Sequence, residues 1–213
     1  MKSKTSFLIC GLIAFFAYKT NAQEFKYGFQ IGIGLSEKRT TEDNSPRFGS
    51  FDIKSEKKVS YSINGYLGFK GKKFFGISLE PGFIQKGYHQ RSLATGIEAY
   101  NINYNYINLP VLADFYIGNS IIVSIGPEIS YLTKANVKSE SFSNPLQYHI
   151  PDFELSGLIG IQFKITQHMD TGLRYNRGLS STSTISFTDD NGQPSGELKE
   201  YNQYYQVFFR YRI

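Results

Sequence analysis

The chain has 213 residues, one cysteine, no tryptophan and a formal net charge of +5, and aromatic residues make up 16% of it. A single cysteine excludes a disulfide framework, and no apolar run reaches the ~20 residues that a membrane-spanning helix needs. Residues 1–22 hold Lys2, Lys4 and Lys19 and no acid, so the charge of the remaining chain is +5 − 3 = +2. This small charge removes the main argument for a nucleic-acid partner, and we expect none.

The first predicted element is a secretory signal peptide. Two lysines precede the apolar run 7–17, and small or polar residues follow it up to Ala22. This order of charged, apolar and small segments is typical of a signal peptide. We therefore expect cleavage near Ala22, which divides the chain into a signal peptide at 1–22 and one domain at 23–213.

The next segment alternates strictly between two kinds of residue. In 25–35 the odd positions are apolar, and the even positions are glycine, lysine or glutamine. Because successive side chains of a strand point to opposite faces, this predicts a strand with one apolar face and one small, polar face. Glycine and amide suit the polar lumen of a barrel whose apolar face meets lipid. Seven further segments show strand character: 58–70, 73–87, 99–117, 120–134, 152–165, 169–182 and 200–213.

Short and long connections alternate between these segments. Tight turns stand at 71–72, 118–119 and 166–168, and the longer polar stretches are 36–57, 88–98, 135–151 and 184–199. Outer-membrane barrels show this alternation, because their periplasmic turns are short and their external loops are long. We predict an all-β fold: an eight-stranded antiparallel transmembrane β-barrel in the outer membrane, with the lipid bilayer as its surroundings.

Three prolines and one change of phase depart from the regular pattern. Pro81, Pro110 and Pro127 fall inside predicted strands, where each removes a hydrogen-bond donor, and we expect bulges or local twists there. In 99–117 the apolar residues switch from even positions up to Tyr106 to odd positions from Ile107. A bulge near Tyr106, or an upper half of the strand that stands clear of the bilayer, would explain the switch.

Four segments of these predicted strands are similar to one protein family. They read LEPGFIQKG at 79–87, YINLPVL at 106–112, GPEISYL at 126–132 and GLRYNRGL at 172–179. In this order they resemble the PorT-like outer-membrane β-barrel proteins of Gram-negative bacteria, most specifically at 106–112. The resemblance implies an eight-stranded barrel and, for the founding member, a role in a secretion and gliding apparatus. Asp114 stands where that family usually has lysine or arginine, and Ile213 where many such barrels end in an aromatic residue.

Charges of both signs lie on the face predicted to line the lumen. The acids are Glu80, Asp114, Glu128 and Glu154, and the bases are Lys70, Lys164, Arg174, Arg210 and Arg212. The interior of an eight-stranded barrel is barely wide enough for its side chains, and an unpaired buried charge is costly. We therefore expect ion pairs that seal the lumen, with Arg174 bridging Glu80, Glu128 or both. A gated pore for small ions is the alternative, and paired carboxylates for glycoside hydrolysis are a third reading.

Other candidate chemistry is sparse. His89, His149 and His168 fall in three different connections without the spacing of metal ligands, so we expect no metal and no cofactor. Ser92 or Ser143 beside a histidine would be needed for a lipid-modifying enzyme, an activity that some small outer-membrane barrels have. The run DDNG at 189–192 resembles part of a calcium loop but lacks the closing glutamate. We expect no catalytic residues.

The external loops are where we expect function, because loops carry function on many folds. The stretch 36–57 is the longest, and Arg39, Arg47, Phe48 and Phe51 are its candidate contacts. We predict a non-enzymatic, monomeric protein that acts as a scaffold, surface-interaction or secretion-accessory component, with an envelope protein or a surface glycan as its partner. The alternatives are a lipid-modifying enzyme or narrow channel of the outer membrane, and a secreted lipocalin-like carrier with its apolar face inward.

Overall fold

The computed structural model describes residues 24–43, 53–71, 74–92, 99–139, 141–146, 150–188 and 191–213. The predicted signal peptide at 1–22 lies outside these residues. The described chain forms these strands: β1 (Glu24–Asp43), β2 (Ile53–Glu56), β3 (Lys58–Lys70), β4 (Phe75–Leu79), β5 (Gly82–Ser92), β6 (Tyr100–Ile117), β7 (Ile121–Lys138), β8 (Ser143–Pro145), β9 (Phe153–Lys164), β10 (Met169–Gly178), β11 (Ser183–Thr188) and β12 (Pro194–Arg212). No helix within the described ranges is long and apolar enough to cross a membrane.

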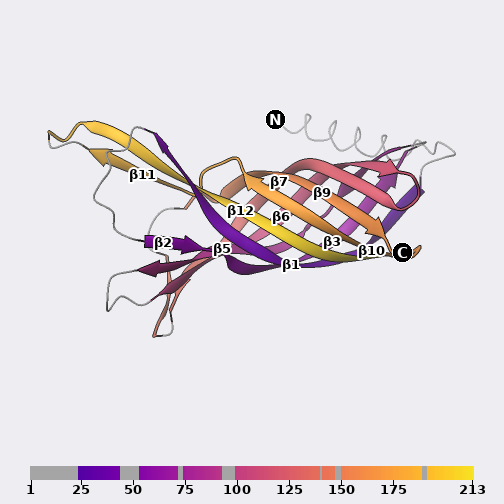
Figure 1. The fold of residues 1–213 in the computed structure, drawn as a ribbon, viewed down its shortest axis with the longest axis horizontal. Helices are drawn as coiled ribbons and strands as arrows, with labels where there is room; N and C mark the ends of the chain where they lie inside the picture. The colour runs from indigo at the N-terminus through magenta and orange to yellow at the C-terminus, as the bar shows by residue number, and fades with distance from the viewer. Residues whose placement is uncertain are drawn as a thin grey trace, which may run out of the picture.

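The strands close into a ring. Each neighbour in the series β1, β3, β4 with β5, β6, β7, β9, β10 and β12 pairs antiparallel with the next. The last strand, β12, pairs with β1 from Gly28↔Arg212 onward, and this pairing closes the barrel (Figure 1). Since β4 and β5 follow each other along one edge of β6, they together fill one of the eight strand positions of the barrel. We call each of these eight positions a stave. The predicted eight-stranded antiparallel barrel is therefore confirmed.

The two faces of the barrel differ as the alternation predicts. Outward side chains are apolar and exposed, for example Ile33 at 61% and Ile63 at 60%. Inward neighbours on the same strands are polar and buried, for example Gln30 at 0% and Ser62 at 1%. An exposed apolar belt around a polar interior suits lipid outside, and it is the reverse of a lipocalin-like carrier.

The prolines do not produce the register shifts that bulges would cause. Pro110 pairs with Glu128 and Pro127 with Gly157, each in the register of the residues around it. At Pro81 the stave is interrupted between β4 and β5, but the register toward β3 and β6 is the same on both sides of the gap. The expectation of bulges at the prolines was wrong. Opposite Pro110, the Glu80 carbonyl oxygen that loses its backbone donor accepts a hydrogen bond from the Asn64 side chain instead.

The predicted irregularity near Tyr106 is confirmed. The β6–β7 register shifts between Asn105 and Tyr106, and Thr133 is the extra residue on β7. Its hydroxyl donates to the Asn105 carbonyl oxygen at 2.9 Å. The faces of β6 do not exchange, because Ile102 and Tyr106 are both buried on the inward side. The change of phase in the sequence therefore marks where the lumen becomes apolar.

Much of the chain predicted as external loops is strand. β1 continues to Asp43 and β7 to Lys138, while β2, β8 and β11 are additional strands. Figure 1 shows β11 with the outer ends of β12 and β1 projecting on one side, and β2 with the outer end of β5 on the other. We call β11, the outer half of β12 and residues 37–43 of β1 the outer hairpin. These strands carry few alternating apolar residues, so a search for apolar alternation misses them.

Candidate functional site

The centre of the lumen is organised around Glu80. Arg174 on β10 donates from Nη2 to Glu80 Oε1 at 2.7 Å, and Arg210 on β12 donates from Nη2 to the same oxygen at 2.6 Å. Arg210 also donates to Gln30 at 2.9 Å and to Gln162 at 2.7 Å. All five side chains are buried. One acid, two bases and two amides from five staves therefore form a single network across the barrel.

A second network lies around Lys86. Its Nζ donates to Glu128 on β7 at 2.9 Å and to Glu154 on β9 at 2.8 Å, and all three side chains are buried. Asn108 donates to Glu128 at 3.0 Å, and Asn202 donates to Glu154 at 2.6 Å. Sequence reasoning missed Lys86. The signal that could have found it is its even position in 73–87, which it shares with Glu80.

The structure buries all six residues of the predicted lumen network. It separates them, because Arg174 contacts Glu80 and not Glu128. Asp114 joins the Glu80 network through hydrogen bonds alone: its Oδ1 accepts from Ser124, whose hydroxyl accepts from Gln162, and no ion pair within the described ranges includes Asp114. The six predicted residues thus divide between two clusters rather than forming one.

The two ends of the lumen differ in character. At the periplasmic end, Arg212 pairs with Asp170 at 2.7 Å, and the ammonium groups of Lys70 and Lys164 lie 4.8 and 5.3 Å from the centre of the Tyr116 ring. Above the Lys86 network, the external end is apolar and buried, and it comprises Ile84, Tyr88, Ile102, Tyr104, Tyr106, Ile150 and Tyr204. Packed side chains therefore occupy the lumen from the Arg212–Asp170 pair to the apolar cluster.

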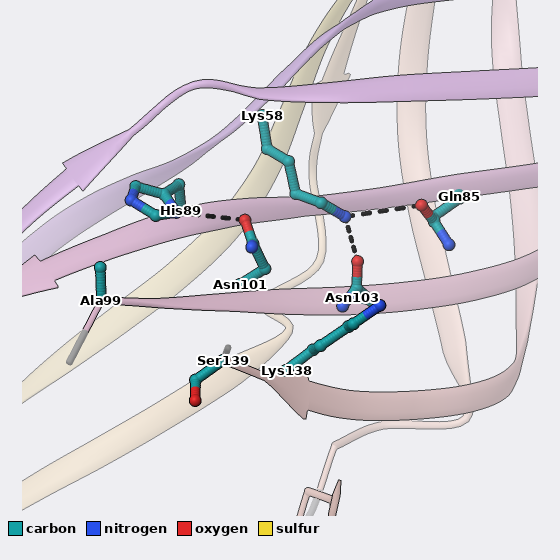
Figure 2. A pocket seen from close by; sticks show the side chains of 8 residues that line it. All are labelled: Lys58, Gln85, His89, Ala99, Asn101, Asn103, Lys138 and Ser139. Atoms are coloured by element: carbon teal, nitrogen blue, oxygen red, sulfur yellow. Dashed lines mark hydrogen bonds between the residues drawn. The ribbon is translucent and has the colours of Figure 1, made fainter. Parts of the chain in front are cut away.

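A polar pocket of about 770 Å³ lies on the wall of the external part, between β3, β5, β6 and the end of β7. Figure 2 shows Lys58 reaching across it to Gln85 and Asn103. Lys58 Nζ donates to Gln85 Oε1 at 3.5 Å and makes a shorter hydrogen bond to Asn103 Oδ1. On another side of the pocket, His89 Nδ1 lies 3.1 Å from Asn101 Oδ1.

The pocket is part of a regular arrangement of polar side chains, which we call the amide wall. Across β6 and β7, Asn101 pairs with Lys138, Asn103 with Asn136 and Asn105 with Lys134. Gly87, with φ +140°, stands opposite Asn103 on β5 and offers no side chain. Lys58 reaches the Asn103 side chain from β3. The apolar cluster lies on the other face of these strands, so the amide wall faces outward.

Lys58 is electrostatically unusual for a residue of this wall. The lipid-facing row of β3 begins at Val59, so Lys58 lies outside the membrane-spanning part of that strand. Burial lowers the pKa of the Lys58 ammonium below its ordinary value. Its ammonium donates to the neutral amides of Gln85 and Asn103, and the described residues that line the pocket include no carboxylate. Among the described residues, the positive charge of Lys58 therefore has no paired carboxylate.

Residues 21–184 match the family described as outer membrane protein beta-barrel domain. The chain belongs to this family. The match covers most of the barrel, from before β1 to within β11. The protein is therefore a β-barrel of the outer membrane, and a lipid bilayer surrounds it.

Solved structures of outer-membrane proteins are similar to this outer-membrane barrel at low sequence identity. Ail, the attachment invasion locus protein of Yersinia pestis, is 14% identical, with a TM-score of 0.45 over 89% of this chain and 99% of that chain. OprG from Pseudomonas aeruginosa is 13% identical, with a TM-score of 0.46 over 90% and 96%. Neisserial surface protein A is 13% identical, with a TM-score of 0.44 over 88% and 99%. No curated protein matches the chain.

The predicted loop contacts of the barrel are only partly described. Arg39 lies on β1 in the outer hairpin, where its guanidinium is 4.5 Å from the centre of the Tyr201 ring. Arg47, Phe48 and Phe51 lie outside the described residues. The stretch that was predicted to be a loop supplies the outer end of β1 and the whole of β2.

The described histidines of the barrel have partners other than serine. His168 Nδ1 donates to the Arg212 carbonyl oxygen at 3.0 Å, and His89 contacts Asn101. His149 and the two aspartates of the DDNG run, Asp189 and Asp190, lie outside the described residues. Among the residues described, no group of three or more histidine, cysteine and acidic side chains is arranged to hold a metal ion.

Proposed function

We propose that this protein is a non-enzymatic, monomeric outer-membrane barrel that binds a partner protein of the cell envelope through its outer hairpin. The observation that carries the proposal is an uncovered strand edge. Pairing between β1 and β3 ends at Ser36↔Lys58, whereas pairing between β1 and β12 continues to Asp43↔Glu197. Within the described ranges, no strand pairs with the other edge of residues 37–43. Such an edge presents backbone N–H and C=O groups to which an extended segment of another chain can add.

Side chains hold this edge in place. Lys38 Nζ pairs with Glu200 at 2.7 Å, and the Arg39 guanidinium lies over the ring of Tyr201. Gln203 donates to Glu37 at 2.9 Å, which adds a third cross-strand contact between β12 and β1. A pre-ordered edge loses less conformational entropy when it binds a partner than a flexible loop does.

The alternatives have less support. A channel would need open space where the Glu80 and Lys86 networks and the apolar cluster pack. A lipid-modifying enzyme would need a serine beside a histidine, but His89 and His168 contact an amide and a backbone oxygen. The resemblance of 106–112 to the PorT-like proteins favours a partner among envelope proteins over a surface glycan.

Site-specific photo-crosslinking in intact cells tests the proposal. A photoreactive residue at Thr40 or Thr41, both exposed on the outer hairpin, is expected to give one defined protein adduct. Replacing residues 38–55 with a short Gly/Ser linker should preserve heat-modifiable folding and abolish recovery of the same partner. Asn119, exposed in the periplasmic turn, is the control position. An adduct that forms at Asn119 but not at the hairpin would move the function to the periplasmic rim and overturn the proposal.

A further inference from the structure

The amide wall continues the lipid-facing surface of the barrel upward. On β6 the outward row contains the exposed residues Leu109 and Ile107, followed by Asn105, Asn103 and Asn101. Since a strand rises ~3.3 Å per residue, these asparagines begin directly above the apolar belt. Aromatic residues mark the same level, because Tyr61, exposed toward lipid, pairs with Gln85 of the pocket. Tyrosine is enriched where the hydrocarbon meets the polar headgroups.

The chemistry of the wall at this height is cationic and amide-rich. Lys58 is half-buried and hydrogen-bonded to two amide oxygens, and Lys138 is exposed at the end of β7. Within the described ranges, neither ammonium forms an ion pair with a carboxylate. A desolvated lysine that lacks an acid partner is ready to accept an anion. The neighbouring amides of Asn101 and Gln85 can both donate and accept, as sugar hydroxyls require.

We propose that the pocket of the amide wall binds the phosphorylated sugar headgroup of a glycolipid in the outer leaflet. The two lysines would hold phosphate and the amides would hold the sugar, while the acyl chains lie against the exposed row below. Basic pockets at headgroup level on membrane proteins recognise anionic lipids in this way. The continuity of the pocket with the lipid-facing surface favours a membrane lipid over a soluble phosphate compound. The site lies on β3, β5, β6 and β7, so it is independent of the partner edge on the outer hairpin.

The test is a titration of the folded, detergent-solubilised protein with diphosphorylated lipid A, with bound lipid counted by native mass spectrometry. We expect a Lys58→Gln/Lys138→Gln variant to bind at least about tenfold more weakly, because two charged hydrogen bonds to phosphate are lost. Removing the phosphates from lipid A should weaken binding to the wild type by a similar factor and leave the variant unchanged. The charge-matched control is Lys57→Gln/Lys199→Gln, which removes two external lysines that do not line the pocket and lie outside the amide wall.

Each outcome is decisive. Equal affinity of the wild type and the Lys58→Gln/Lys138→Gln variant for lipid A overturns the proposal, and so does an equal loss in the control variant. Inorganic phosphate is the second probe: if it displaces lipid A at micromolar concentration, the site belongs to a soluble phosphate and not to a headgroup. Heat-modifiable migration checks the folding of each variant. If the double variant does not fold, the single Lys138→Gln change at an exposed position should still weaken binding measurably.

Discussion

Asn64 donates from its side-chain amide to the backbone carbonyl oxygen of Glu80 at 2.9 Å. Glu80 N–H donates to the Pro110 carbonyl at 3.1 Å, so the two residues stand opposite each other at a hydrogen-bonded position of the antiparallel ladder. Proline has no N–H to return, and the Glu80 carbonyl would otherwise lack its ladder donor. The Asn64 side chain on β3 therefore supplies the hydrogen bond that the Glu80 carbonyl oxygen cannot receive from Pro110.

We expect an Asn64→Ala variant to lose about 1–3 kcal/mol of unfolding free energy, because a buried carbonyl is left without a donor. Restoring a backbone donor with Pro110→Val in the same variant should recover part of this loss. Urea unfolding in lipid vesicles, followed by far-ultraviolet circular dichroism, measures both. Asn105→Ala, outside the lumen, is the control. If Pro110→Val recovers no unfolding free energy in the Asn64→Ala background, the unsatisfied Glu80 carbonyl is not the cause of the lost stability.

Lys86 should be the most sensitive single position of the lumen. Lys86→Met leaves Glu128 and Glu154 buried without a cation, and we expect a loss of about 3–5 kcal/mol. Neutralising both acids as well, with Glu128→Gln and Glu154→Gln, should recover most of it. The same urea titration gives the free energies. A triple variant as unstable as Lys86→Met would show that packing, and not charge, sets the requirement for lysine.

The wild-type barrel should give no large, steady conductance in planar bilayers, because packed side chains occupy its lumen. Arg174→Ala removes a side chain that fits against Gly160, where an added Cβ would lie 2.9 Å from Arg174 Cγ. We expect the resulting space beside Glu80 to give a measurable conductance. Arg177 is an exposed arginine on the same strand, and the control variant Arg177→Ala should give no conductance. A large wild-type conductance would refute the sealed lumen.

The cost of a charge on the outer surface should depend on depth. Ile125 lies in the middle of the outward row of β7, and Ile117 ends β6 beside the periplasmic turn; both are exposed. We expect Ile125→Arg to cost about 2–4 kcal/mol and Ile117→Arg about 0–1 kcal/mol. Both free energies come from urea titrations of the protein folded into vesicles, in which heat-modifiable migration in gels gives the folded fraction. Equal costs at the two positions would mean that the apolar belt does not span the bilayer.

The barrel itself could be predicted because lipid outside and a polar lumen inside impose a two-residue period. That period places Ile33 and Gln30 on opposite faces from their positions in the sequence alone. The outer hairpin obeys no such rule. Thr40 and Thr41 meet water rather than lipid, so their strand leaves no apolar signature, and its pairing with β12 is visible only in the structure.

The partners within the lumen depend on register, which the sequence pattern does not specify. Glu128 and Glu80 share a face and a charge, yet one contacts Lys86 and the other Arg174. The choice follows from how far each stave is shifted along its neighbours. The amide wall escaped prediction for a similar reason, because Lys58 on β3 and Asn103 on β6 are far apart in the sequence and meet only through the register of the strands between them.

The pairing of β1 with β12 has a consequence for how the protein is made. Every other pair of neighbouring staves joins strands that follow each other in the chain, whereas this one joins the two ends of the domain. Bringing distant segments together carries the largest loop-closure cost and slows folding. Until β12 arrives, an inserted intermediate would expose two unpaired edges to lipid, which hydrocarbon does not tolerate. We therefore expect insertion to wait for the complete chain, so that a protein truncated before β12 never enters the membrane and remains a substrate for periplasmic proteases.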